Sequence, residues 1–243
     1  MTDPTWTTPP RHPILVPGEV HVWRVPLDAA PERIADLRRR LSADEAEQAD
    51  RFHFDIDRGR YVVAHAALRT LLAGYLGAER YLEPFETGPN GKPFTRDSAA
   101  PRFNLAHSRN IGLVAITASR DIGVDVEAID RNVEVEHIAD RFFSVPEFQA
   151  LLALPAERRR EGFFHIWSQK EAYLKGRGEG VAGGLDHFDV EPHPDRPARL
   201  VADRRNPDAP GRWFLDSLAA GAGFRATVAL EGPPSRIRCF AWG

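Results

Sequence analysis

The stretch Gly123-Val124-Asp125-Val126-Glu127 decides how the second half of the chain folds. Apolar and acidic residues alternate in it with the two-residue period of a β-strand, so Asp125 and Glu127 share one face. Val124 and Val126 then point toward a core on the other face. The same alternation is also typical of an ordinary half-buried strand whose polar face meets solvent, and this reading stays open for the stretch alone.

A second stretch, Trp167-Ser168-Gln169-Lys170-Glu171-Ala172-Tyr173-Leu174-Lys175, has helical spacing and places Glu171 and Lys175 one turn apart. Alone, this pair also fits an exposed salt bridge worth about 0.3 to 0.5 kcal/mol. Together the two stretches offer three carboxylates and one ammonium. Carboxylates this close repel one another unless a cation neutralises them, and Mg²⁺ accepts hard oxygen ligands while leaving room for phosphate and water. The combination predicts metal-assisted chemistry on a phosphate or pyrophosphate.

Composition narrows the class of protein. The 243 residues suffice for one large domain or two modest ones, and 32 basic against 35 acidic residues give a net charge of −3. We therefore expect no nucleic-acid partner and no anionic membrane surface as a partner. The single cysteine, Cys239, permits no intramolecular disulfide, and neither an apolar signal core in Met1 to Pro13 nor a run long enough to span a bilayer is present. A soluble cytoplasmic protein is predicted.

Two segments of similar pattern suggest that the chain is built from two related halves. Leu41-Ser42-Ala43-Asp44-Glu45 and Phe143-Ser144-Val145-Pro146-Glu147 both predict a capping box that opens a short helix. A longer helix is expected after each, over about 57–76 and 157–175, and glycine follows both. Chance recurrence of Ser-x-x-Glu is an equally good explanation of the capping boxes by themselves.

Strand-like runs surround these helices, and the segments expected to be strands are 20–25, 103–106, 111–117, 122–127, 187–191, 213–215, 224–230 and 237–242. Residues 192–210 are dense in Pro, Asp and Arg and predict a surface loop. The predicted organisation is a flexible N-terminal segment 1–13, an N-terminal α+β half 14–119 and a C-terminal α+β half 120–243 that carries the metal site.

Three further segments could bind phosphate. Asn90-Gly91-Lys92-Pro93 is a turn that projects one lysine, Phe103-Asn104-Leu105-Ala106-His107-Ser108 ends a strand in donors, and Arg58 and Arg60 begin the first long helix. Each also has an ordinary reading, as a plain hairpin, a helix cap or turn, and solvated charges. The sequence contains no Gly-x-Ser-x-Gly elbow, Walker loop or dinucleotide-binding fingerprint.

In order and spacing, five of these motifs resemble the signature motifs of the Sfp-type 4′-phosphopantetheinyl transferases. They are Asn90 to Pro93, Phe103 to Ser108, Gly123 to Glu127, Phe142-Phe143-Ser144-x-x-Glu147 and Trp167-Ser168-x-Lys170-Glu171-Ala172-x-x-Lys175, within a match that spans about 42–184. The resemblance implies a monomeric α+β pseudodimer of two similar halves, each a small, mainly antiparallel sheet packed against helices. It also implies that coenzyme A binds in the cleft between the halves.

The resemblance further implies the reaction, in which a serine of an apo acyl, peptidyl or aryl carrier protein takes the phosphopantetheine arm of coenzyme A and adenosine 3′,5′-bisphosphate leaves. Such carriers serve fatty-acid, polyketide or nonribosomal-peptide pathways. By position, Asp125, Glu127 and Glu171 would hold Mg²⁺, or Mn²⁺ in its place. The catalytic set implied is Glu171, Lys175 and Asp125, with Glu171 helping to deprotonate the serine and Lys175 steadying the pyrophosphate. The implied coenzyme A contacts are Lys92, Pro93, Ala106, His107 and Lys175, and Ala106 stands where the family usually has the first serine of Ser-His-Ser. Near Glu45 and Gln48, where some members carry lysines, this chain has none, and Arg51, Arg58 or Arg60 is expected to supply that charge, with Arg60 as the first choice.

Two other functions fit the same residues. One is a catalytically silent module that binds coenzyme A or a carrier protein, and the other is a metal-dependent phosphohydrolase. Nucleases that pair an acid with a lysine usually set them two apart on a strand, whereas Glu171 and Lys175 are expected on a helix, which favours the transferase over the phosphohydrolase.

Overall fold

The computed structural model describes residues 6–9, 13–97, 100–130, 132–180, 184–233 and 236–243. Two compact units make up the chain, and each is described by itself. The N-terminal unit comprises Pro4–Gly88, Pro93–Ser119 and Ser235–Gly243. The C-terminal unit contains Pro89–Lys92 and Arg120–Pro234.

A four-stranded sheet in the order β11-β1-β5-β4 forms the centre of the N-terminal unit. Its strands are β1 (Glu19–Pro26), β4 (Arg102–Ser108), β5 (Ile111–Thr117) and β11 (Arg236–Ala241). β5 is antiparallel to both β1 and β4, whereas β11 runs parallel to β1. A separate hairpin pairs β2 (Glu86–Thr87) with β3 (Pro93–Phe94), as the plain-hairpin reading of the Asn90 turn anticipated.

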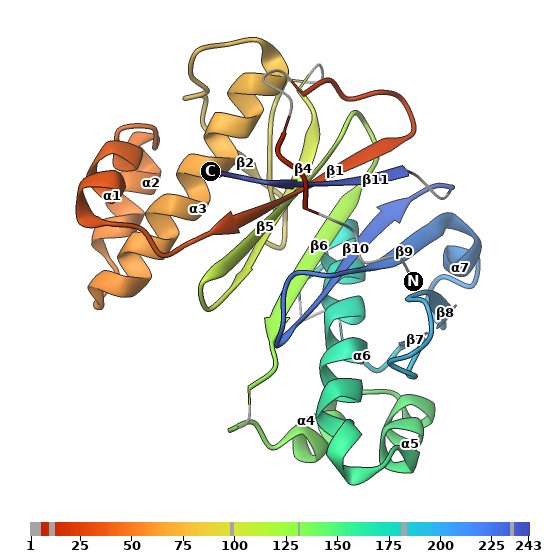
Figure 1. Ribbon diagram of the computed structural model, residues 1–243. Helices are drawn as coiled ribbons and strands as arrows, with labels where there is room; N and C mark the ends of the chain where they lie inside the picture. Colours follow the sequence, from red (N-terminus) through yellow and green to blue (C-terminus); the bar gives the residue numbers. More distant parts are fainter. Residues whose placement is uncertain (1–5, 10–12, 98–99, 131, 181–183, 234–235) are drawn as a thin grey trace. The chain divides into compact units, whose positions relative to one another are not determined.

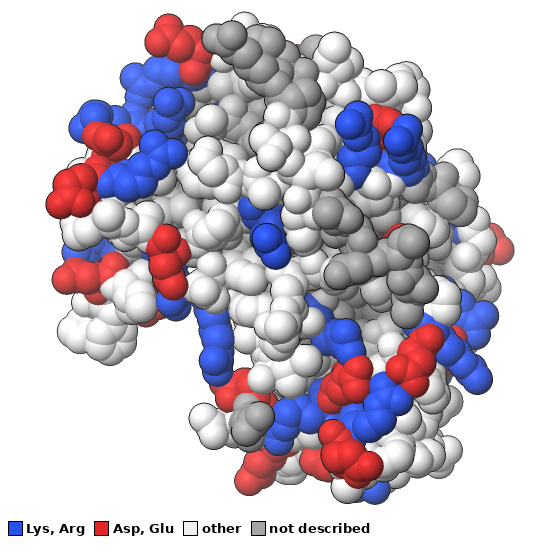
Figure 2. Space-filling model, in the orientation of Figure 1, with Lys and Arg blue, Asp and Glu red and all other residues white. Residues whose placement is uncertain are grey.

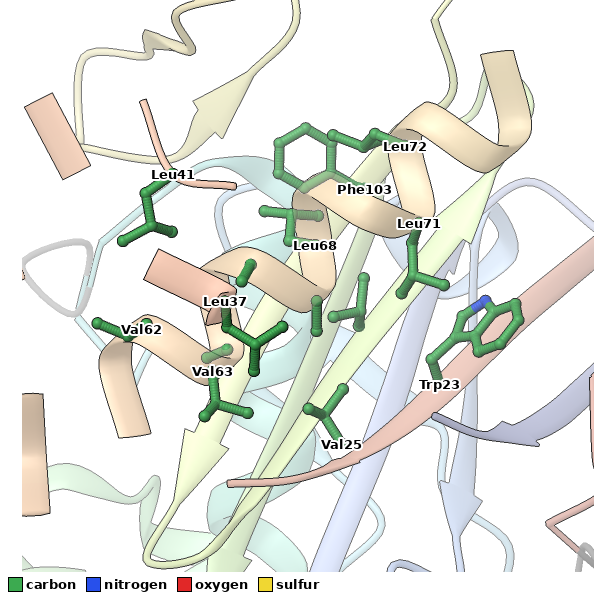
Figure 3. Close-up of a cluster of buried hydrophobic side chains, with 14 of the residues drawn as sticks. Trp23, Val25, Leu37, Leu41, Val62, Val63, Leu68, Leu71, Leu72 and Phe103 are labelled. Atoms are coloured by element: carbon green, nitrogen blue, oxygen red, sulfur yellow. The ribbon is translucent and has the colours of Figure 1, made fainter. Parts of the chain in front are cut away.

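Three helices pack beside this sheet: α1 (Pro31–Arg38), α2 (Ala43–Asp50) and α3 (Asp55–Leu76) (Figure 1). The core between them combines Trp23 and Val25 of β1 with Leu68 and Leu72 of α3 and Phe103 of β4 (Figure 3). Because these five side chains are at most 3% exposed, they supply much of the hydrophobic stabilisation of this unit.

The last strand differs from its predicted assignment. The predicted C-terminal half extends to residue 243, whereas β11 hydrogen-bonds to β1 in the N-terminal unit. The reason is side-chain burial, since Phe240 lies 1% exposed against Trp23 with ring centroids 4.9 Å apart. Of the predicted flexible segment, residues 1–5 and 10–12 lie outside the described residues, and Thr7 pairs with β11 through Cys239 O and the Ala241 amide.

The C-terminal unit is built on a three-stranded antiparallel sheet in the order β6-β10-β9. Its strands are β6 (Ile122–Ala128), β9 (Trp213–Leu218) and β10 (Phe224–Glu231), and α6 (Ala156–Arg177) packs along β6 and β10 (Figure 1). Two shorter helices, α4 (Val135–Phe142) and α5 (Val145–Ala153), pack against α6.

The predicted surface loop over residues 192–210 is wrong in part. It contains β8 (Leu200–Asp203), which pairs with β7 (Phe188–Val190), and the start of α7 (Ala209–Arg212). Leu200 is 5% exposed and Ala209 fully buried, so this Pro-rich segment is anchored in the core of the unit by its few apolar residues.

Both predicted capping boxes are present. Ser42 Oγ accepts from the Glu45 amide and Ser144 Oγ accepts from the Glu147 amide, while each glutamate accepts from the amide of its serine. In each unit the capped helix precedes a 22-residue helix, α3 or α6, that ends at a left-handed glycine, Gly77 or Gly178. The predicted α+β fold class is confirmed, and the division at residues 119–120 into two related halves stays a prediction.

Charged side chains of both signs interleave on the face drawn in Figure 2, in keeping with the net charge of −3. None of the helices in the described parts of the chain is both long enough and apolar enough to cross a bilayer.

Candidate active site

The acidic face of β6 is buried at Asp125 and half-buried at Glu127, although β6 is an edge strand of its sheet. Asp125 is 2% exposed because α6 covers this face, so the solvent-face alternative is wrong for Asp125. Close approach of helix and strand depends on Gly123, where an added Cβ would lie 2.0 Å from Ala172 O. Only glycine fits that position without moving α6.

Helix α6 brings Lys175 onto the covered acid. Lys175 Nζ lies 2.5 Å from Asp125 Oδ1, and this pair replaces the exposed Glu171–Lys175 salt bridge considered above. Burial lowers the pKa of Lys175, but the opposing attraction of Asp125, Glu171 and Glu127 is stronger and raises the pKa overall. Lys175 is therefore a fixed positive charge among three carboxylates at neutral pH.

Two carboxylate oxygens beside Lys175 are left without partners. Asp125 Oδ2 and Glu171 Oε1 are buried and accept no hydrogen bond from any described residue. Burial raises the pKa of Glu171, Lys175 lowers it less, and the nearby Asp125 raises it further. Buried acceptors of this kind are costly unless a cation or another donor satisfies them.

The residues of this site fit a divalent metal through that unsatisfied pair of oxygens. Asp125 Oδ2 and Glu171 Oε1 are hard oxygen donors of the type that Mg²⁺ accepts. Glu127 lies two residues along the same strand, half-buried, and stands opposite Arg225 in the β6–β10 register. Among the described residues, no three His, Cys, Asp or Glu side chains are already gathered in the geometry of a metal centre.

Lys92 also lies in the C-terminal unit, although its sequence position precedes β3. Its Nζ donates to Ile122 O and Gly176 O, both at 2.9 Å. The predicted contact of Lys92 with a coenzyme A phosphate stays a prediction, and the observed bonds join this side chain to β6 and α6 instead.

Four of the predicted coenzyme A contacts, Arg60, Pro93, Ala106 and His107, lie in the N-terminal unit. Arg60 Nε donates to Asp28 Oδ1 at 2.8 Å, so this guanidinium is ion-paired. Alternation along β4 buries Ala106 and exposes His107. Pro93 is the first residue of β3 and is registered with Thr87. The roles of these residues toward coenzyme A stay predictions.

Comparison with known proteins identifies the family. A 4′-phosphopantetheinyl transferase of Nostoc sp., HetI, is 37% identical to this chain over 96% of both proteins. The chain belongs to the 4′-phosphopantetheinyl transferase superfamily. The model of this superfamily matches residues 121–229, which contain Asp125, Glu171 and Lys175.

Other phosphopantetheinyl transferases show the same likeness. Psf-1 of Bacillus pumilus is 33% identical over 86% of this chain and 87% of its own length. Sfp of Bacillus subtilis is 28% identical over 79% of this chain and 83% of its own length. The resemblance drawn from the five motifs is thereby confirmed.

One buried pair in this phosphopantetheinyl transferase was not anticipated. Lys170 Nζ lies 2.7 Å from Glu147 Oε2, with both side chains at most 1% exposed, and also donates to Leu185 O and Phe188 O. The sequence predicts a capping role for Glu147 and places both residues in signature motifs, but it does not predict that they pair. Glu147 and Lys170 are distant in sequence, so no local pattern joins them. The one signal in the sequence is a lysine within a turn of a helix whose other residues are buried, because such a lysine needs an acidic partner.

Proposed function

We propose that this chain transfers the 4′-phosphopantetheine arm of coenzyme A to a serine of an apo carrier protein in a Mg²⁺-dependent reaction. Family membership supports the class of reaction. The observation that carries the proposal is the arrangement of Lys175, Asp125 and Glu171, in which a paired ammonium lies beside two buried, unsatisfied carboxylate oxygens. That arrangement suits the neutralisation of charge on a reacting pyrophosphate.

Asp125, Glu127 and Glu171 are the residues we assign to the metal, either Mg²⁺ or Mn²⁺. A divalent ion bound there would neutralise pyrophosphate oxygens as a Lewis acid. Burial raises the pKa of Glu171, which makes its carboxylate a stronger base than that of an exposed glutamate. Lys175, held protonated by its acidic neighbours, supplies a positive charge to the pyrophosphate.

The proposed reaction is a direct transfer that needs no covalent intermediate with the enzyme. The carrier serine Oγ forms a bond to the phosphorus that bears the pantetheine arm, and its proton passes to Glu171. The bond from that phosphorus to the bridging pyrophosphate oxygen breaks, and adenosine 3′,5′-bisphosphate leaves with the electron pair. The contribution of the protein is positioning and charge stabilisation, the main sources of catalysis in phosphoryl-type transfer.

The proposed coenzyme A contacts and acceptor proteins are inferred from the 4′-phosphopantetheinyl transferase family. Arg60, Pro93, Ala106, His107 and Lys175 are the contacts that we assign to coenzyme A, whereas the ammonium of Lys92 is bonded to two backbone carbonyls. Acyl, peptidyl and aryl carrier domains are the proposed acceptors, as in polyketide or nonribosomal-peptide synthesis. We propose that the protein acts as a monomer in the cytoplasm, where its single cysteine, Cys239, stays reduced.

Intact-mass spectrometry tests this function directly. Apo acyl, peptidyl and aryl carriers are incubated separately with the protein, coenzyme A and Mg²⁺, beside reactions with Glu171→Ala or a chelator. The expected result is a phosphopantetheine-sized gain on at least one carrier, lost in both controls. No gain on any carrier by folded protein that binds coenzyme A would contradict the proposal and favour a silent binding module.

A further inference from the structure

The segment Pro89–Lys92 lies against the C-terminal end of α6. Lys92 Nζ donates to Gly176 O, in the last turn of α6, and to Ile122 O, at the first residue of β6. Asn90 Nδ2 donates to Gly178 O at 3.0 Å. Two side chains of one short turn therefore hold three backbone carbonyls around the end of this helix.

The position of the ammonium is favourable for a helix end. Carbonyls in the last turn of a helix have no intrahelical donor and carry the negative end of the helix dipole. The aliphatic stem of Lys92 also passes close to the turn, since a Cβ added at Gly178 would lie 3.7 Å from Lys92 Cδ. Gly178 has φ of +69°, the left-handed conformation that ends α6.

The same ammonium joins the helix to the strand where the two backbones come closest. A Cβ added at Gly123 would lie 2.3 Å from Gly176 N, so no side chain fills the space between β6 and the last turn of α6. Lys92 bonds to the residue before Gly123 and to Gly176 itself. These bonds therefore join β6 to α6 at this point.

The joined backbones lie next to the active-site residues. Lys175, directly before Gly176, must reach Asp125, three residues beyond Ile122, to form the 2.5 Å contact. We propose that Lys92 is a positioning residue that clamps the end of α6 to β6 and thereby holds Lys175 and Glu171 against Asp125. The consequence for catalysis rests on the proposed transferase function, whereas the clamp itself does not.

Hydrogen exchange of the protein without substrates tests the clamp. Lys92→Met removes the bonds of the ammonium to Gly176 O and Ile122 O, and Asn90→Ala removes the bond to Gly178 O. Arg96→Met is the matched control, because it removes an exposed cation four residues away that pairs with Glu86. We expect amide exchange over residues 174–179 to rise about tenfold in Lys92→Met, less in Asn90→Ala and not in Arg96→Met. Unchanged exchange in both Lys92→Met and Asn90→Ala would overturn the proposal. If Lys92→Met fails to fold, Asn90→Ala decides alone.

Transfer kinetics separate positioning from a direct contact with coenzyme A. A clamp predicts that Lys92→Met lowers kcat about tenfold or more while KM for coenzyme A stays within about twofold. A rise of about tenfold in KM with unchanged kcat would instead show a phosphate contact and overturn the positioning role. If the wild-type protein transfers nothing, the proposed function fails, and the exchange experiment still decides whether the clamp exists.

Discussion

Removing the ammonium of Lys170 should strongly destabilise the protein. Lys170→Met leaves the Glu147 carboxylate buried at 1% exposure with its cation gone. Glu147 keeps the amides of Val190 and Ser144 as donors, at 2.8 and 3.0 Å. Breaking a buried pair from one side costs about 3 to 5 kcal/mol. At roughly 2 to 4 °C per kcal/mol for a chain of this size, Tm should fall by about 6 to 20 °C.

A double variant identifies the cause of that loss. Glu147→Gln keeps an acceptor for the capping box, so Lys170→Met combined with Glu147→Gln removes the buried charge but not the helix cap. Urea unfolding should show the double variant about 2 kcal/mol more stable than Lys170→Met alone. As a control, Arg51→Ala, which breaks an exposed pair with Glu47, should cost no more than about 1 kcal/mol. A Lys170→Met loss below about 1 kcal/mol, or a double variant as unstable as the single one, would refute the reasoning.

Three other outcomes are expected. Glu171→Gln should slow carrier modification at least about 100-fold in a mass-spectrometric time course while Tm changes by only a few degrees, and a rate within tenfold of wild type would remove Glu171 from the mechanism. Burial raises the pKa of Glu45, but hydrogen bonds from His65 and Arg69 outweigh it and lower this pKa from 4.5 to about 2. The stabilisation from Glu45 is therefore complete above about pH 4.5 and is lost as the pH falls toward 2. The difference in unfolding free energy between wild type and Glu45→Gln, up to about 3 kcal/mol, should shrink across that range. A difference independent of pH would contradict this. Gly123→Ala should lower stability by about 3 kcal/mol, because the added Cβ meets the backbone of α6. Gly74→Ala, in α3 with no atom within 4 Å of its added Cβ, should raise stability by about 0.5 to 1 kcal/mol. If thermal unfolding shows both changes with the same sign, packing of the added Cβ does not decide stability at these positions.

Local patterns in the sequence predicted the elements that have strong local signals. The two capped helices have both serine and glutamate of the capping box, and α3 and α6 are long and end at glycine. Three of the described helices are not predicted by the sequence: α7 is only four residues long, and α1 and α4 are eight residues each and begin without a side-chain cap. Short helices of this kind are stabilised by tertiary packing, as Leu37 and Ala139 show by their burial, and such packing leaves little trace in the local sequence.

Partners distant in sequence could not be predicted from local patterns. Residue spacing predicts Glu171 and Lys175 on one helix and Asp125 on a strand. It does not predict which carboxylate the lysine contacts. The choice of Asp125 follows from the backbone approach at Gly123, which lets α6 lie close enough for Lys175 Nζ to reach the strand. A pattern of residue types therefore predicts which functional groups are present at this site. Which of them form an ion pair, here Lys175 with Asp125, depends on the packing of α6 against β6.

That distinction explains why Lys92 has two readings. As a lysine projected from a stiff turn it suits an anion, and nothing in the turn itself indicates another partner. In the folded chain the ammonium of Lys92 lies at the negative end of the α6 dipole. Two backbone carbonyl oxygens there accept its hydrogen bonds, as the oxygens of a phosphate could. Since the same charge can serve either partner, sequence identifies Lys92 as a residue of interest, and only the position of the helix end decides what it binds.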